Sequence, residues 1–153
     1  LREETSAAAC DALMRGQLDC VLLALPYPCG EVARETLFDD AFDIAFHRSE
    51  PPSRDARIAA ADIDPERLLL LEDGHCLKDH ALAACNRPEL RADAAILGTS
   101  LHTLVQMVDN RLGLTLLPRM AVDAAILTGT DVEARPLAGD RAKREIALIW
   151  RPA

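Results

Sequence analysis

The sequence predicts an α/β fold with a mainly parallel sheet. Segments with apolar residues at helical spacing alternate along the chain with short apolar runs that are typical of strands. The clearest of these runs, Leu18 to Leu25, is almost continuously apolar and is ended by Pro26 and Pro28. Such a run is typical of a strand that is buried on both faces of a parallel sheet. The chain of 153 residues, 50% hydrophobic and 27% charged, has room for one domain or two small lobes.

The first half of the chain begins with a predicted helix. Residues 6–15 carry apolar side chains on one helical face, and Thr5 or Ser6 can cap the first turn. After the strand of residues 18–25, the pattern predicts in chain order a strand region over 36–47, a polar loop over 49–57, a short helix over 59–66 and a buried strand from Arg67 to Leu71.

The second half continues the alternation. A strand is predicted near residues 94–97, and Thr99 or Ser100 can cap a helix whose apolar face consists of Leu101, Leu104, Val105 and Val108. The remaining predicted elements are a strand Leu114 to Leu117, a helix 119–126, a loop through Gly129 and Gly139, and a strand Ile146 to Trp150. Because the chain opens on a helix-flanking segment and closes on a strand, we expect it to be a fragment.

Charge and composition exclude several classes of function for this chain. A net charge of −8, without a run of Lys or Arg, argues against nucleic-acid binding by the chain itself. No apolar run approaches the roughly 20 residues of a membrane span, and we expect a cytoplasmic protein without membrane contact. The five cysteines form no C-x-x-C pair, so neither a structural zinc site nor an iron–sulfur cluster is expected. We predict no metal and no cofactor.

One cysteine lies where a predicted strand gives way to a predicted helix. The segment runs from Leu71 through His75 and Cys76 to His80. Backbone N–H groups at a helix N-terminus and nearby cationic side chains both favour thiolate over thiol, and the thiolate is the form that attacks peroxides and disulfides. Cys76 is therefore a candidate reactive thiol.

A second cysteine follows nine residues later, at Cys85. If residues 77–85 form one helix, a rise of ~1.5 Å per residue separates the two Cα atoms by roughly 13 Å, whereas a disulfide needs about 4.4–6.8 Å. The pair could close only if the helix unwound. The segment therefore holds either two unrelated thiols or a redox switch that rebuilds local structure on oxidation.

The other cysteines and the histidines have simpler interpretations. Cys10 and Cys20 are predicted to be small apolar residues on a helix and in a buried strand, and Cys29 is the one of the three most expected to be exposed. We expect a reducing compartment to keep most thiols free. The spacing of His80 from Cys76 could support a metal, but no third ligand is in register, so a surface position is favoured for it, as for His47 and His102.

Three patterns in the chain resemble one protein family. They are Leu13-x-x-Gly16-x-Leu18-Asp19, the run Leu71 to Cys76 with Asp79 and Cys85, and Gly113-x-x-Leu116-Leu117-Pro118. The first and third resemble the effector domains of LysR-type transcription regulators in general. The second resembles the OxyR group, the peroxide-sensing members of that family. The resemblance covers essentially the whole chain.

The resemblance implies a two-lobed domain similar to periplasmic binding proteins. Lobe I, which is incomplete, should comprise residues 1–38 and 146–153, and lobe II residues 39–145. The family implies a preceding helix-turn-helix DNA-binding domain, assembly into dimers and tetramers, contact with DNA and RNA polymerase only through the full-length protein, and a thioredoxin- or glutaredoxin-type reductant. Hydrogen peroxide is the implied ligand, and an enzyme is not implied.

The resemblance also assigns roles to single residues. Cys76 matches the peroxide-reacting cysteine and Cys85 its resolving partner. His75 and Asp79 match polar neighbours of the reactive thiol, and Arg144 matches an arginine near it. Ser6 falls where relatives commonly have a threonine that binds peroxide.

One corner departs from the family pattern. LysR-type proteins usually read Ala-Gly-Leu-Gly between helix and strand, whereas this chain reads Asn110-Arg111-Leu112-Gly113. If the corner needs a positive φ at the second position, Arg111 is strained there.

Three classes of function remain open. The first is a redox-sensing regulatory domain in which Cys85 captures oxidised Cys76. The second is a thiol peroxidase that uses the same chemistry with steady turnover. The third is an effector domain that binds a small metabolite between the lobes, with incidental cysteines.

Overall fold

The computed structural model describes residues 1–71, 76–85, 97, 98 and 100–153, with Cys76 and Leu97 described through their backbone alone. The helices are α1 (Ser6–Met14), α2 (Cys76–Ala84), α3 (Leu101–Asp109) and α4 (Arg119–Asp123). The strands are β1 (Cys20–Leu25), β2 (Ala33–His47), β3 (Leu70–Leu71), β4 (Leu97–Gly98), β5 (Thr115–Pro118), β6 (Val132–Pro136) and β7 (Lys143–Trp150).

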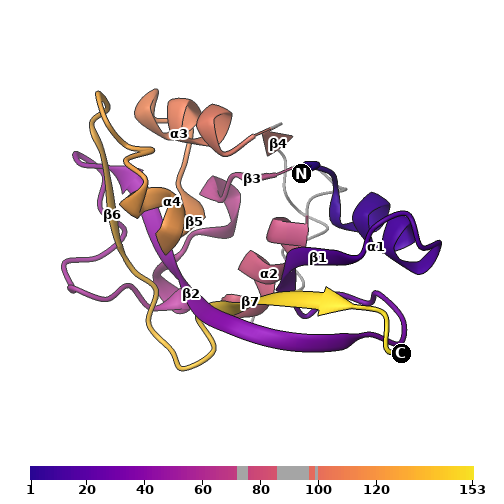
Figure 1. Cartoon of the computed structure of the whole chain (residues 1–153). Coiled ribbons are helices and arrows are strands. Elements are labelled where there is room, and N and C mark those ends of the chain that lie inside the picture. The colour runs from indigo at the N-terminus through magenta and orange to yellow at the C-terminus, as the bar shows by residue number, and fades with distance from the viewer. Residues whose placement is uncertain (72–75, 86–96, 99) are drawn as a thin grey trace.

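Strand β2 pairs with three other strands and connects the two ends of the sheet. Over residues 33–41 it pairs with β7, and over residues 42–47 it pairs with β5 and β6. Strand β1 completes the sheet on the far side of β7. Figure 1 shows the result: β2 runs obliquely across the molecule, with α1 and β1 at one end and α3, α4, β5 and β6 at the other.

The prediction of α/β structure is confirmed, but the mainly parallel sheet is wrong for the described residues. Every pair in the five-stranded sheet is antiparallel, and parallel pairing is limited to β3 with β4 and to the bridges Ile58–Leu137 and Leu68–Leu114. The apolar run of β1 misled the prediction, because a continuous run indicates burial without fixing strand direction. Among the described strands, β1 pairs only with β7. It packs one face on α1 and exposes Cys20 and Leu22 on the other.

Local signals placed most other elements well. Thr5 caps α1, its hydroxyl accepting from Ala8 N–H at 3.3 Å, and Ser100 caps α3 in the same way through Thr103 N–H at 3.2 Å. The predicted helix over 59–66 is instead two 3₁₀ turns, Ala60–Asp62 and Pro65–Arg67, because a residue before proline disfavours the α conformation. Strand β6 was missed, since its charged residues and Pro136 resemble a loop.

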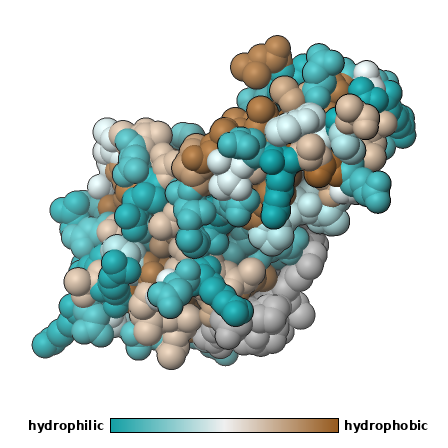
Figure 2. All heavy atoms as spheres, turned by 60° about the horizontal axis from the view of Figure 1, so that its bottom comes forward, coloured by the Kyte–Doolittle hydropathy of each residue, from teal (hydrophilic) through white to brown (hydrophobic). Residues whose placement is uncertain are grey.

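In the described part of the chain, apolar side chains form three buried clusters. One lies between α1, β1 and β7, at the end of the molecule that projects as an arm in Figure 2. The other two lie where β2 meets β5 and β6 and pack against α2 and α3. On the arm the sheet leaves Leu22, Phe38 and Trp150 partly exposed. None of the helices in the described ranges is long and apolar enough to cross a membrane.

The corner after α3 meets the condition under which strain was expected at Arg111. Arg111 has φ +62°, and the backbone bonds Arg111 N–H to Val108 O (2.9 Å) and Leu112 N–H to Met107 O (3.0 Å) form a Schellman ending. An L-residue with a side chain is disfavoured in this conformation, which suits glycine. Gly113 is needed for a different reason: a Cβ there would lie 2.2 Å from the Arg67 carbonyl oxygen.

We expect Arg111→Gly to raise the free energy of unfolding by roughly 0.5–1 kcal/mol, because relief of the left-handed strain exceeds the extra entropy of glycine in the unfolded chain. Urea denaturation measures the change. Arg111→Ala is the matched control, since it also removes the exposed guanidinium but keeps the Cβ, and it should give no gain. An equal gain in both variants would assign the effect to the lost charge instead.

Candidate functional site around helix α2

Helix α2 begins at Cys76, as the sequence predicts. The short buried strand β3 precedes it, and residues 72–75, including His75, lie outside the described residues. The Cys76 backbone N–H is among the first four of the helix, which have no intrahelical acceptor. The start of α2 therefore has the positive electrostatic character that favours a thiolate at its first residue.

Most of the described side chains of α2 are buried. Lys78, His80 and Leu82 are each at most 5% exposed, whereas Asp79 and Ala83 face solvent. Asp79 and Ala83 are four residues apart and so form one narrow exposed stripe. The helix contacts β3 on one side and β7 on the other, and Figure 1 shows it between these strands. A helix held on so many sides cannot change conformation without disturbing its neighbours.

Cys85 lies at the far end of the helix. Its side chain is 3% exposed, and its backbone N–H donates to Ala81 O at 3.1 Å, so the helical hydrogen bonding continues through it. A helical rise over nine residues separates its Cα from that of Cys76 by roughly 13 Å, about twice the span of a disulfide. In this conformation the two cysteines cannot be joined.

His80 links α2 to the loop after β1. Its Nε2 donates to the Pro26 carbonyl oxygen at 2.7 Å, and Pro26 follows a cis peptide bond. The surface position expected for His80 is therefore wrong. Sequence reasoning also missed Lys78, whose buried position could have been read from its place among Leu77, Ala81 and Leu82 on the apolar side of the helix.

Arg144, on β7, is held by a buried carboxylate. Its Nε donates to Asp40 Oδ2 at 3.0 Å, and the other oxygen of Asp40 accepts from Met120 N–H at 3.0 Å. The side chains of Arg144 and Asp40 are 13% and 2% exposed, so the pair is shielded from water. Truncating either partner would leave the other charge buried and unpaired.

Further acidic residues of β2 engage neighbouring cations. Lys143 Nζ contacts Asp39 Oδ2 at 2.5 Å, and this hydrogen bond raises the pKa of Lys143. Arg119 forms a two-pronged pair with Asp43, and the hydrogen bond to that carboxylate raises the pKa of Arg119. Both side chains therefore keep their positive charge at neutral pH.

Arg144 and the second half of α2 share a cavity. It has a volume of about 350 Å³ and is lined by Pro26, His80, Ala83, Ala84, Arg141, Lys143 and Arg144. Arg144 thus lies beside the end of α2 that leads to Cys85. Ser6 opens α1 and is partly buried.

The three remaining cysteines differ from their predictions. Cys10 and Cys29 form a disulfide with a Cα–Cα distance of 5.4 Å, and both are buried. Cys29 is therefore not an exposed residue, and Cys10 and Cys29 are not independent apolar side chains. Cys20 is exposed, because the first residue of the edge strand β1 faces solvent. Pairing over 19 residues depends on how α1 packs against the loop after β1, which spacing does not reveal.

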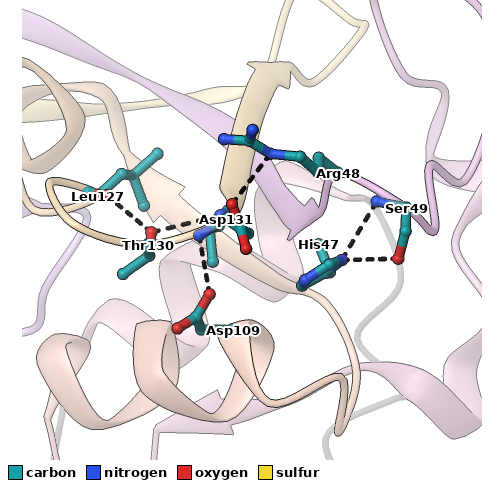
Figure 3. Close-up of polar contacts among 8 residues, drawn as sticks. His47, Arg48, Ser49, Asp109, Leu127, Thr130 and Asp131 are labelled. Atoms are coloured by element: carbon teal, nitrogen blue, oxygen red, sulfur yellow. Dashed lines mark hydrogen bonds and ion pairs between the residues drawn. The ribbon is translucent and has the colours of Figure 1, made fainter.

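A second polar cluster surrounds the end of β2 (Figure 3). His47 is 8% exposed, which corrects its predicted surface position, while His102 is exposed as predicted. One potential ligand atom from each of His47, Asp109 and Asp131 lies within 4.8 Å of the others. These groups also have structural partners: Ser49 N–H donates to His47 Nδ1 at 3.2 Å, and Asp131 N–H donates to Asp109 Oδ1 at 2.8 Å. The cluster joins β2, α3 and the start of β6.

Comparison with known proteins identifies relatives along the whole chain. The "LysR substrate binding domain" family model matches residues 1–153. The chain is 36% identical over 156 residues to "HTH-type transcriptional regulator EstR" of Acinetobacter baylyi, covering 99% of this chain and 50% of that protein. It is 37% identical over 137 residues to the "Hydrogen peroxide-inducible genes activator" of Dickeya chrysanthemi, covering 90% of this chain and 45% of that protein.

Solved structures agree with these matches. The reduced form of the OxyR2 regulatory domain from Vibrio vulnificus superposes with a TM-score of 0.86 at 37% identity, covering 100% of this chain and 72% of that one. The chain spans about half the length of the curated relatives it matches.

Proposed function

This chain belongs to the LysR substrate-binding-domain family, and we propose that it is the peroxide-sensing part of its regulator, with Cys76 as the sensing thiol and Cys85 as its partner. The family is regulatory, so the chain is not an enzyme. The observation that carries the proposal is helix α2, which begins at one of these cysteines and keeps the other buried beyond its last turn. The similarity to hydrogen peroxide-inducible activators supports it.

The proposed chemistry oxidises two thiols and reduces one peroxide. The Cys76 thiolate attacks one peroxide oxygen, the O–O bond breaks, and the departing hydroxide takes up a proton as water. Cys76 is left as a sulfenic acid. The Cys85 sulfur then attacks the Cys76 sulfur, an S–S bond forms, and the hydroxyl leaves with a proton as the second water.

Closing this bond requires α2 to melt. Bridging a separation of roughly 13 Å demands that several residues of the helix give up their hydrogen bonds. The oxidised form is then a separate conformation, and its changed surface around α2 is the signal. Melting also exposes Lys78 and His80 to water. Their hydration offsets part of the free-energy cost of exposing the apolar side chains of α2.

We assign supporting roles to four further residues. His75 and Asp79 are polar neighbours of the thiol, and Ser6 supplies a hydroxyl that binds peroxide. Arg144 places a positive charge beside α2. Its buried pair with Asp40 supports a fixed position for that charge, and it shares a cavity with His80.

At the level of the whole regulator, we propose the two-lobe division given above, with residues 1–38 and 146–153 in lobe I and 39–145 in lobe II. The switch of β2 from pairing with β7 to pairing with β5 and β6 near residue 41 supports a boundary in that strand. Dimers and tetramers would carry the α2 signal to DNA-binding domains and RNA polymerase. A thioredoxin- or glutaredoxin-type protein would reset the switch.

We expect low micromolar hydrogen peroxide to join Cys76 to Cys85 in the reduced chain. Trypsin cuts after Lys78, so the two cysteines fall in the separate peptides 68–78 and 79–91, and mass spectrometry of a non-reduced digest detects their cross-link directly. Exposed Cys20 should remain open to alkylation and serves as the internal control. A different partner for Cys76, or a Cys76 that stays fully alkylatable, would refute the assignment.

A second candidate is an effector domain that binds a small metabolite. The observation in its favour is that the relative covering 99% of this chain is described as an HTH-type transcriptional regulator, without reference to peroxide. Ligand-dependent thermal stabilisation of a chain whose cysteines stay reduced would favour this candidate over the redox switch.

A further inference from the structure

The Cys10–Cys29 pair is built differently from the Cys76–Cys85 pair. Its Cα atoms are 5.4 Å apart, within the range of about 4.4–6.8 Å that a disulfide spans. Both residues are 6% exposed and belong to the apolar cluster between α1, β1 and β7. The pair can therefore open and close without a change in the backbone, whereas Cys76 and Cys85 need a helix to melt.

One of the two segments that this pair joins reaches the candidate site. Cys10 is on α1, one turn after Ser6, and Cys29 is in the loop that begins at Pro26. The same loop reaches α2 through the bond from His80 Nε2 to the Pro26 carbonyl oxygen, 2.7 Å long. A bond between Cys10 and Cys29 thus fixes α1 to the loop that supports the middle of α2.

We propose that Cys10 and Cys29 form a second redox centre, a buried dithiol that hydrogen peroxide converts to a disulfide clamp independently of Cys76 and Cys85. One sulfur attacks peroxide, so that an S–O bond forms, the O–O bond breaks and one water leaves. The other sulfur attacks the resulting sulfenic acid, an S–S bond forms, and the second water leaves. Two thiols are oxidised, and one peroxide is reduced to two waters.

Burial selects the oxidant. Burial among apolar side chains disfavours the thiolate, so these sulfurs, on residues that are 6% exposed, react during local opening. A smaller opening admits peroxide than admits a bulky disulfide such as oxidised glutathione in line for exchange. The same shielding slows reductants, so the clamp should outlast the Cys76–Cys85 bond. The geometry excludes Cys20 as an alternative partner for Cys10. Val21 and Leu23 pack in the same cluster as Cys10, and Cys20 points to the opposite face of strand β1.

The test uses the chain with Cys20, Cys76 and Cys85 replaced by serine, which leaves only the proposed pair. After full reduction, hydrogen peroxide should remove two thiols per chain and cross-link peptides 3–15 and 16–34. The melting temperature should rise by roughly 6–12 °C, because the bond closes a loop of about 20 residues in the unfolded chain. Oxidised glutathione should act much more slowly.

The control adds Cys29→Ser to the same background and should show neither the cross-link nor the rise. Thiols that stay alkylatable, that over-oxidise without a cross-link, or that leave the melting temperature unchanged on cross-linking would overturn the proposal. If the multiple variant fails to fold, the wild-type chain is used instead. Fragmentation of its cross-linked peptides 3–15 and 16–34 in the mass spectrometer shows whether Cys10 is bonded to Cys29 or to Cys20, and a bond to Cys20 overturns the proposal. Because Cys76 and Cys85 are absent from the test chain, its outcome is separate from that of the proposed switch.

Discussion

Replacing Cys76 by serine is expected to abolish the peroxide-dependent link between peptides 68–78 and 79–91, whereas Cys85→Ser should leave the first oxidation intact. A serine hydroxyl is not ionised at neutral pH and does not attack peroxide, so nothing is formed for Cys85 to capture. In Cys85→Ser the Cys76 sulfenic acid has no resolving thiol, and further peroxide carries it to sulfinic acid. A sulfenic-acid probe followed by peptide mapping measures both outcomes.

The two variants form a matched pair, since each removes one of the two sulfurs at the ends of α2. Probe labelling should occur on peptide 68–78 of Cys85→Ser and be absent from peptide 79–91 of Cys76→Ser. Labelling of Cys85 in the Cys76→Ser chain, at a rate similar to that of Cys76, would show that the roles are reversed or shared. Circular dichroism of the reduced variants verifies that each retains its fold.

Oxidation is expected to speed hydrogen exchange at the amides of residues 80–85. In the reduced chain these N–H groups are bonded within α2 or, for Cys85, to Ala81 O at 3.1 Å. Closing the Cys76–Cys85 bond removes these helical hydrogen bonds and lowers the free energy needed to open each amide. Each ~1.4 kcal/mol of that decrease speeds exchange tenfold, so we expect an acceleration of roughly 100-fold or more. Exchange mass spectrometry of reduced and oxidised chains makes the comparison.

Strand β1 supplies the internal reference, because its hydrogen bonds are made to β7 and none of them to α2, so its exchange should change much less than that of residues 80–85. Peroxide-treated Cys85→Ser supplies the second control: Cys76 is oxidised there, but no bond forms, so α2 should stay protected. If a chain with a mapped Cys76–Cys85 bond kept full protection over residues 80–85, then melting could not be the signal and the switch would need another explanation.

The sequence predicted the features that depend on neighbours three or four residues away. The start of α2 at Cys76 and the Ser100 cap of α3 follow from local hydrogen bonding, and the sequence marked Arg111 as strained if its φ were positive, as it is. Local rules were weaker where proline interrupts a helical pattern, as at Pro65. The spacing of Cys76 and Cys85 gave their separation along a helix, whereas their assignment as a redox pair came from the resemblance to the OxyR group.

Contacts between segments far apart in the chain could not be predicted in this way. Strand direction in the sheet, the burial of Lys78, His80 and His47, and the pairing of Cys10 with Cys29 depend on which surfaces meet after folding. The pattern of one segment indicates that a face is buried but not what buries it, because the hydrophobic effect has no direction. Polar residues such as His80 are then buried wherever a distant partner, here the Pro26 carbonyl, satisfies them.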